Sequence, residues 1–150
     1  MKHSAKIKKV RWNRLKELSK VLDQYRIFYD QESHPKKAYT FLKDRFRKNQ
    51  SLIYTATIDN KIVGFTQLYP SYSTVSLEKL MILNDLFVLE EYRGKGIATQ
   101  LLNKAKKHCV KKNYKGLALE TATNNPARKL YEREKWASDS QFIHYFWARE

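Results

Sequence analysis

Two of the chain's four glycines lie within one short basic segment, Arg93-Gly94-Lys95-Gly96-Ile97-Ala98. The segment stands between an apolar run that ends at Val88 and an amphipathic run that predicts a helix. The first turn of a helix carries backbone N–H groups without partners and a partial positive charge, so it attracts anions. Glycine also adopts a positive φ and lets an anion approach the backbone closely. This spacing therefore favours the binding of a phosphate group at the start of a helix.

A second segment, Asn124-Asn125-Pro126-Ala127-Arg128-Lys129-Leu130-Tyr131-Glu132, follows the next strand that the sequence predicts. Pro126 suits the start of a helix, and Asn124 or Asn125 would cap it. Together the two segments resemble the two signatures of the GNAT superfamily of acetyl-CoA-dependent N-acetyltransferases, over roughly residues 50–148. The signature Arg/Gln-x-x-Gly-x-Gly/Ala is matched by Arg93, Gly96 and Ala98, and Asn-x-x-Ala-x-x-x-Tyr is matched by Asn124, Ala127 and Tyr131.

The chain departs from the second signature at one place. Lys135-Trp136 stands where the family has a glycine followed by an aromatic residue. We therefore expect either a less sharp turn after the short helix or an unfavourable φ at Lys135.

The resemblance implies a binding site for acetyl-CoA, with coenzyme A as the product. Backbone groups of Leu86 and Val88 would pair with the pantetheine arm like an added strand. An N–H near Val88 would stabilise the developing oxyanion, and the amides from Gly94 to Thr99 would hold the pyrophosphate. The full set of expected cofactor contacts is Leu86, Phe87, Val88, Arg93, Gly94, Lys95, Gly96, Ile97, Ala98, Thr99, Asn124, Ala127 and Tyr131.

The catalytic groups that the resemblance implies are an acid and a base. Tyr131 is the candidate acid, because a phenol is protonated at neutral pH and can protonate the departing thiolate. Asp85 is the candidate base, with Glu120 on the adjoining strand and a chain of water molecules as alternatives. Strand alternation would turn Asn84 to one face and Asp85 to the other. Asp85 would be a structural carboxylate if the acceptor amine lay on the Asn84 face.

The acceptor site is expected at the end of the first helix and the loop that follows it. Tyr25, Tyr29 and Glu32 would form an aromatic and acidic lip that attracts an amine. His144, in the last predicted strand, would face the same site. A solvated helix end with aromatic residues packed inward is the competing interpretation for these residues.

These residues need a set of elements to position them. Helical spacing predicts helices from Leu15 to Tyr25, from Pro35, from Gly94 and from Pro126. β-Branched and apolar runs predict strands, with a turn at Asp59-Asn60. The expected fold is α/β (α+β), a single GNAT domain over residues 1–150, with about four helices and a mixed sheet of about six to seven strands, splayed at the cofactor site. The expected strands are a short one ending near Trp12, then 52–58, 61–68, 79–88, 117–121 and 141–147.

Composition narrows the function classes. The net charge is +15, but the surplus lies at the two ends of the chain, because residues 51–100 hold 4 Lys/Arg and 5 Asp/Glu. No apolar run is long enough to span a membrane, and no secretory signal begins the sequence, so we expect a cytoplasmic protein. The single cysteine and four scattered histidines predict neither a disulfide nor a metal site.

The leading prediction is an N-acetyltransferase that acts on a primary amine of a small molecule such as a polyamine or an amino acid. A transferase for protein or peptide amines is one alternative, and a GNAT protein that binds acyl-CoA without catalysis is another. A nucleic-acid-binding domain would explain the charge. It is not favoured, because no nucleic-acid-reading motif is present. The resemblance also makes a homodimer one option for the assembly.

Overall fold

The computed structural model describes residues 4–150. It forms two compact units, Met1–Glu120 and Thr121–Glu150. The first unit holds the sheet, three α-helices and the glycine segment, and the second holds one short helix. The fold is the mixed α/β arrangement that the sequence predicts, with four α-helices in the described chain. The prediction of a single domain over 1–150 stays a prediction.

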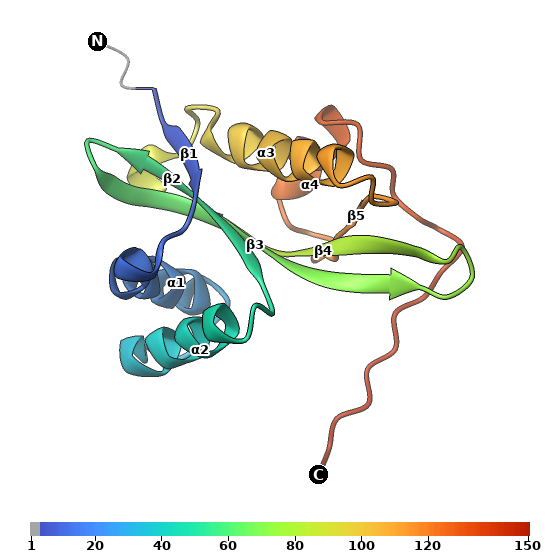
Figure 1. Ribbon diagram of the computed structural model, residues 1–150, viewed down its shortest axis with the longest axis horizontal. Coiled ribbons are helices and arrows are strands. Elements are labelled where there is room, and N and C mark those ends of the chain that lie inside the picture. The colour runs from blue at the N-terminus through green and yellow to red at the C-terminus, as the bar shows by residue number, and fades with distance from the viewer. Residues whose placement is uncertain (1–3) are drawn as a thin grey trace. The chain divides into compact units, whose positions relative to one another are not determined.

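A five-stranded sheet forms the centre of the first unit, in the order β1-β2-β3-β4-β5 (Figure 1). Each of the first three strands is antiparallel to the next, and β5 is parallel to β4. The strand bounds are β1 Lys6–Lys9, β2 Leu52–Ile58, β3 Lys61–Ser73, β4 Glu78–Val88 and β5 Leu117–Ala118. The fifth strand is much shorter than the predicted 117–121, because it pairs with β4 only at Met81 and Ile82.

Helices cover both faces of this sheet. The helices α1 (Leu15–Phe28) and α2 (Pro35–Arg47) lie on one side, and α3 (Ile97–Lys111) lies on the other (Figure 1). Pro35 begins α2 as predicted, since proline suits the first helical position. The predicted apolar stripe of α3 is buried, and that of α1 joins Phe65 and Phe87 of the sheet in one core. These apolar faces hold the helices against the sheet.

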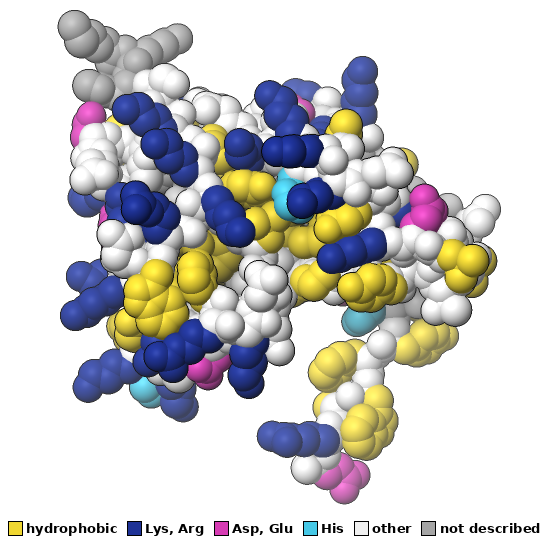
Figure 2. Space-filling view, viewed as in Figure 1, with side chains coloured by type: hydrophobic (Ala, Val, Ile, Leu, Met, Phe, Trp, Pro, Cys, Tyr) yellow, Lys and Arg dark blue, Asp and Glu magenta, His cyan; other side chains and the backbone are white. Residues whose placement is uncertain are grey.

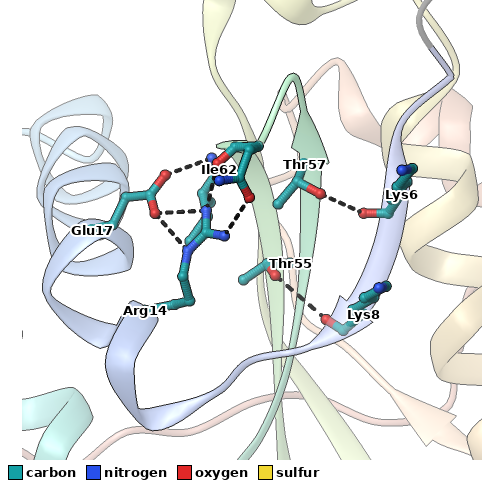
Figure 3. A network of polar contacts seen from close by, with 8 residues as sticks. Lys6, Lys8, Arg14, Glu17, Thr55, Thr57 and Ile62 are labelled. Atoms are coloured by element: carbon teal, nitrogen blue, oxygen red, sulfur yellow. Dashed lines mark hydrogen bonds and ion pairs between the residues drawn. The ribbon is translucent and has the colours of Figure 1, made fainter.

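A polar network fastens the start of α1 to the turn between β2 and β3 (Figure 3). Glu17 accepts a hydrogen bond of 2.7 Å from the backbone N–H of Ile62. Arg14 donates to Glu17 (Nε to Oε2, 2.7 Å) and to the backbone carbonyl of Asn60 at 2.9 Å. Asp59 and Asn60 form the predicted turn with positive φ values. This network fixes where α1 lies on the sheet.

The ladder between β3 and β4 contains a bulge. Gln67 pairs with Asp85, but the next residue of β3, Leu68, pairs with Leu83, so Asn84 is the extra residue. A bulge reverses the alternation of side chains along the strand. Leu83 and Asp85 therefore face opposite sides of the sheet, and Asp85 lies on the side of α1 and α2.

The second unit contains α4 (Ala127–Arg133). The predicted cap is made by Asn125, whose Oδ1 accepts from the N–H of Ala127 at 2.9 Å. After the helix, Lys135 has φ +64°, the unfavourable value expected where the family has glycine. The N–H groups of Lys135 and Trp136 donate to the carbonyls of Glu132 (3.0 Å) and Tyr131 (2.9 Å), so the turn stays sharp.

The prediction of a final strand over 141–147 is wrong. In the structure this segment is irregular, and its large apolar side chains are exposed. A strand requires a neighbour with which to share its backbone hydrogen bonds, and the described chain shows no ladder for this segment. The sheet therefore has five strands rather than six or seven.

Candidate functional site

The glycine segment forms a tight loop between β4 and α3. Gly94 and Gly96 have φ values of +70° and +74°, which only glycine adopts without strain. A Cβ built at either position would meet no other atom within 4 Å, so the space above the loop is open. No side chain caps the start of α3. The first N–H groups of this helix therefore face an open space, which is the arrangement that binds a phosphate.

The basic side chains of the loop hold its shape. Arg93 donates from Nε to the carbonyl of Val88 at 2.8 Å, and its guanidinium lies over the rings of Phe28 (5.6 Å) and Phe87 (5.4 Å). Lys95 donates to the carbonyl of Glu91 at 3.0 Å. Both charges remain beside the glycines, so they add positive potential to the start of α3.

The end of β4 presents an unpaired backbone edge within the first unit. The N–H of Leu89 donates to the carbonyl of Val63 at 2.9 Å. Hydrogen-bonded pairs alternate in an antiparallel ladder, so Phe87 also bonds to β3 while Leu86 and Val88 direct their polar groups away from it. Within residues 4–120, β5 pairs with β4 only at Met81 and Ile82. The backbone groups of Leu86 and the N–H of Val88 are thus available to an extended ligand, whereas the carbonyl of Val88 already accepts from Arg93.

The carboxylate of Asp85 is buried beside this edge. It accepts hydrogen bonds from Gln67 (Nε2 to Oδ2, 2.9 Å) and from Asn84 (Nδ2 to Oδ1, 3.1 Å). Burial raises the pKa of Asp85 above its usual range, although hydrogen bonds with Gln67, Asn84 and Tyr25 oppose this shift. No cation is among these partners. The site therefore holds a carboxylate that accepts a proton more readily than an exposed one.

A cavity of about 320 Å³ opens over Asp85 between α1, α2, β3 and β4. Burial and the nearby charge of Asp85 raise the pKa of Tyr25. The same two causes raise the pKa of Tyr69 to about 12, while Arg45 acts in the opposite direction. Both phenols therefore stay neutral at physiological pH. The lining residues are Leu22, Tyr25, Arg26, Lys37, Ala38, Phe41, Gln67, Tyr69, Asn84 and Asp85.

The other residues predicted for the acceptor site lie around this cavity or away from it. The ring of Tyr29 lies 5.1 Å from that of Tyr25 and is 45% exposed, but Tyr29 does not line the cavity. The side chain of Glu32 is exposed, and its backbone carbonyl accepts a bond from Arg26 at 3.0 Å. Glu120, the alternative base, is exposed and does not line the cavity. The structure thus brings together Tyr25 and Asp85 from the sequence prediction.

Several predicted residues belong to the second unit. Asn124 precedes α4, and Ala127 and Tyr131 lie on it, where the Tyr131 ring is 6.0 Å from that of Trp136. His144 lies in the irregular segment, and its side chain is exposed. Their roles stay predictions.

Three residues in or beside the cavity were not predicted from the sequence, namely Gln67, Tyr69 and Arg45. Gln67 carries the one available signal, because a glutamine within an otherwise apolar strand must find a polar partner when it is buried. The bulge at Asn84 gave no such signal, since no glycine or proline marks it. It also explains why Asn84 and Asp85, expected on opposite faces, both line the cavity.

Neither a membrane span nor a metal cluster is found among the described residues. No helix there is long and apolar enough to cross a bilayer, and no group of three His, Cys, Asp or Glu side chains gathers at one place. On the face shown in Figure 2, Lys and Arg side chains are spread widely instead of forming one stripe. Such a distribution is typical of solvated helix faces.

Comparisons with known proteins identify the family of the chain. A family model described as the acetyltransferase (GNAT) family matches residues 16–135. The chain is 41% identical over 129 residues to the uncharacterized N-acetyltransferase YhfO of Bacillus subtilis, covering 85% of this chain and 87% of that protein. It is 33% identical over 134 residues to a probable acetyltransferase of Haemophilus influenzae, covering 81% and 91%. The crystal structure of a probable acetyltransferase is similar with a TM-score of 0.91 and 34% identity, over 97% of this chain and 98% of the other.

Proposed function

The chain belongs to the GNAT family of acetyltransferases, and on this premise we propose that it transfers the acetyl group of acetyl-CoA to a primary amine of a small molecule. The observation that carries the proposal is the buried carboxylate of Asp85, which has a raised pKa and lines a cavity beside an open strand edge. A base of this kind is what an ammonium substrate needs, because only the neutral amine is nucleophilic.

The residues of the first unit fit acetyl-CoA. Its pyrophosphate suits the uncapped start of α3, where two glycines with positive φ leave open space above the backbone. Its extended pantetheine arm contains amides that suit the outward backbone groups of Leu86 and Val88. Acetyl-CoA would supply the thioester whose carbonyl carbon the amine attacks.

The protons of the transfer balance as follows. Asp85 takes one proton from the ammonium, and the neutral nitrogen then forms the C–N bond while the C–S bond breaks. The nitrogen loses a second proton to solvent as it becomes an amide, and Asp85 then also returns its proton to solvent. Tyr131 donates a proton to the departing sulfur and is protonated again from solvent, so one proton is released overall. An outward N–H of β4 near Val88 would stabilise the negative charge on the carbonyl oxygen. The assignment of Tyr131 rests on its place in the second signature.

We also propose the cytoplasm as the site of this reaction, since the single cysteine, Cys109, is buried and forms no disulfide. A homodimer stays a proposal for the assembly.

The first experiment measures acetyl-CoA binding and turnover. We expect micromolar acetyl-CoA to raise the melting temperature, and a panel of primary amines to release thiol from it. Binding without thiol release for any amine would instead indicate an acyl-CoA-binding regulator. An absence of binding in calorimetry would contradict the proposal.

A matched pair of glycine variants tests the loop. Gly96→Ala places a Cβ at a positive φ and in the space proposed for phosphate, so we expect about a tenfold or larger rise in the Kd of acetyl-CoA. Gly116→Ala is the control, because it also meets nothing within 4 Å but has no positive φ and lies outside the loop. Equal effects of the two variants would mean that the loop does not bind the cofactor.

A further inference from the structure

Gln67, which lines the Asp85 cavity, carries a second acceptor atom that has no partner among the described residues. Gln67 is 1% exposed, and its Nε2 donates to Asp85. This bond fixes the orientation of the amide, because a carboxylate accepts and needs the NH₂ side. The Oε1 atom is therefore the one that does not bond to Asp85, and it is buried without a hydrogen bond among the described residues. A buried acceptor of this kind is normally satisfied, so its partner is expected to be a ligand.

A primary ammonium group would satisfy this end of the cavity. It has three N–H donors, and the cavity offers the Asp85 carboxylate and Gln67 Oε1. The aromatic walls, Tyr25 and Tyr69, add ring faces that attract a cation. The ammonium would thus be held by the same carboxylate that removes its proton.

The outer side of the cavity carries the opposite charge. Lys37 lines the cavity, and no hydrogen bond or ion pair of its ammonium is found in the described chain. Arg45 lies beside the cavity. Its guanidinium is 4.8 Å from the ring centroid of Phe41, which lines the cavity. The Nε of Arg45 is buried and unpartnered. Arg26, the third cation, is already paired with Asp23 at 3.2 Å.

Acidic side chains do not cancel this positive region. Asp44 lies in the neighbouring hollow on α2, but it shares that hollow with Lys36, Lys37 and Arg45. A diamine or polyamine would bring its second ammonium towards these cations. A carboxylate at the same place would instead pair with them.

We propose that the acceptor is a small amino carboxylate, such as an α-amino acid, rather than a polyamine. Its ammonium binds at Asp85 and Gln67 Oε1, and its carboxylate binds at Lys37 and Arg45. The volume of about 320 Å³ suits a molecule of this size. This inference rests on the proposed acetyl transfer, because it names the substrate class of that same site.

The test compares amines that differ only in the carboxylate. Each of the twenty protein amino acids, with ornithine, is assayed for thiol release from acetyl-CoA beside its decarboxylated amine and its carboxamide. We expect kcat/KM to favour amino carboxylates by roughly tenfold to a hundredfold, because hydrogen bonds to charged groups are lost without the carboxylate. Equal or better use of the diamines or the carboxamides would overturn the proposal.

Three variants locate the carboxylate site. Lys37→Met and Arg45→Met should each raise KM for the amino carboxylate by roughly tenfold and leave the decarboxylated amine unaffected. Lys36→Met is the matched control, since Lys36 lies on the same helix, does not line the cavity and, unlike Arg45, does not act on the pKa of the cavity residue Tyr69. An equal loss for both amines, or an effect as large for Lys36→Met, would contradict the assignment.

A binding experiment with acetyl-CoA and no acceptor distinguishes a failure of the proposed acetyl transfer from a failure of the proposed substrate class. If acetyl-CoA does not raise the melting temperature, acetyl transfer itself fails. If it does, and no amino carboxylate is acetylated, the substrate class is wrong while the cofactor site stands.

Discussion

Two buried carboxylates on the α1–α2 side of the sheet have pKa values that are shifted in opposite directions. Asp23 on α1 accepts hydrogen bonds from Ser33 Oγ (2.6 Å), the N–H of His34 (2.7 Å) and Arg26 (3.2 Å). Burial acts to raise the pKa of Asp23, but these bonds and the charge of Arg26 outweigh it and the pKa is lowered. Asp85 on β4 is as little exposed to solvent as Asp23 (7% against 5%), but it lies deeper among protein atoms, so burial outweighs its hydrogen bonds and its pKa is raised.

Two things differ between these aspartates: Asp85 lies deeper in the protein, and its partners carry no charge. Asp23 has a cation and a backbone N–H, and its bonds tie α1 to the loop before α2. The partners of Asp85 are neutral amides and a phenol, and one side of it opens into a cavity. A buried carboxylate with a cation is therefore a structural clamp, whereas one with neutral partners is ready to take a proton.

The largest effect is expected when Asp85 loses its basicity. Asp85→Asn keeps the shape and the hydrogen bond from Gln67 but cannot accept a proton from the substrate. We expect kcat/KM for thiol release to fall by about 10²- to 10⁴-fold at neutral pH. Acetyl-CoA binding, followed by thermal shift, should not change. A loss of less than threefold would assign the base to water and make Asp85 a structural residue.

The converse variant, Asp23→Asn, should affect stability rather than chemistry. It removes the ion pair with Arg26, and because an amide has only one acceptor oxygen, either Ser33 or His34 loses its acceptor. We expect a loss of about 2 kcal/mol in the free energy of unfolding, measured by urea denaturation at pH 7. The kcat should be close to that of the unmodified protein at a temperature where the variant is folded. A large loss of kcat without a loss of stability would mean that Asp23, like Asp85, takes part in the chemistry.

The contrast between these aspartates shows how far the sequence leads. The signatures at Gly96 and Tyr131 predicted the family, and Asp85 was a candidate because it stands on the strand that precedes the glycines. Asp23 gave no signal, since its partners Ser33 and His34 come from a loop whose path depends on how α1 and α2 pack. Gln67 signalled only that it needs a polar partner, because the bulge at Asn84 decides which residue it meets.

The helices and strands show the same difference between local patterns and long-range contacts. Helices with an apolar stripe were predicted because their periodicity is local, as in α3. The segment 141–147 has the composition of a strand, but its state depends on a pairing partner that composition does not specify. Local patterns thus predicted the helices and the glycine loop, while long-range pairing decided the number of strands.

The pH dependence of stability provides a third way to test the comparison. A raised folded pKa means that ionisation of Asp85 costs stability as the pH rises from the unfolded value of about 3.8 through the folded one. Asp85→Asn should therefore melt at a higher temperature than the unmodified protein at pH 7–8, by roughly 2–4 °C, with no difference near pH 4. For Asp23, with a lowered pKa, the stability is present above the unfolded pKa and is lost as the pH falls. Asp23→Asn should accordingly be least different in acid.

The opposite signs of these two differences are the essential observation. Melting curves from pH 4 to pH 8 measure both variants against the unmodified protein. Differences of the same sign at pH 7–8 would mean that the two carboxylates have the same role.

The smallest effects come from removing one neutral hydroxyl donor at each site. Tyr25→Phe takes away a hydrogen bond that lowers the pKa of Asp85, so that pKa rises further. The acidic limb of the kcat/KM profile should then move to higher pH, with about a two- to fivefold loss near pH 6. Ser33→Ala removes the matching bond at Asp23, and we expect a stability loss of about 1 kcal/mol with the pH–rate profile unchanged. A shifted profile in Ser33→Ala, or an unshifted one in Tyr25→Phe, would contradict the distinction. It would mean that the hydrogen bonds of Asp23 do not serve stability alone, or that those of Asp85 do not control proton transfer.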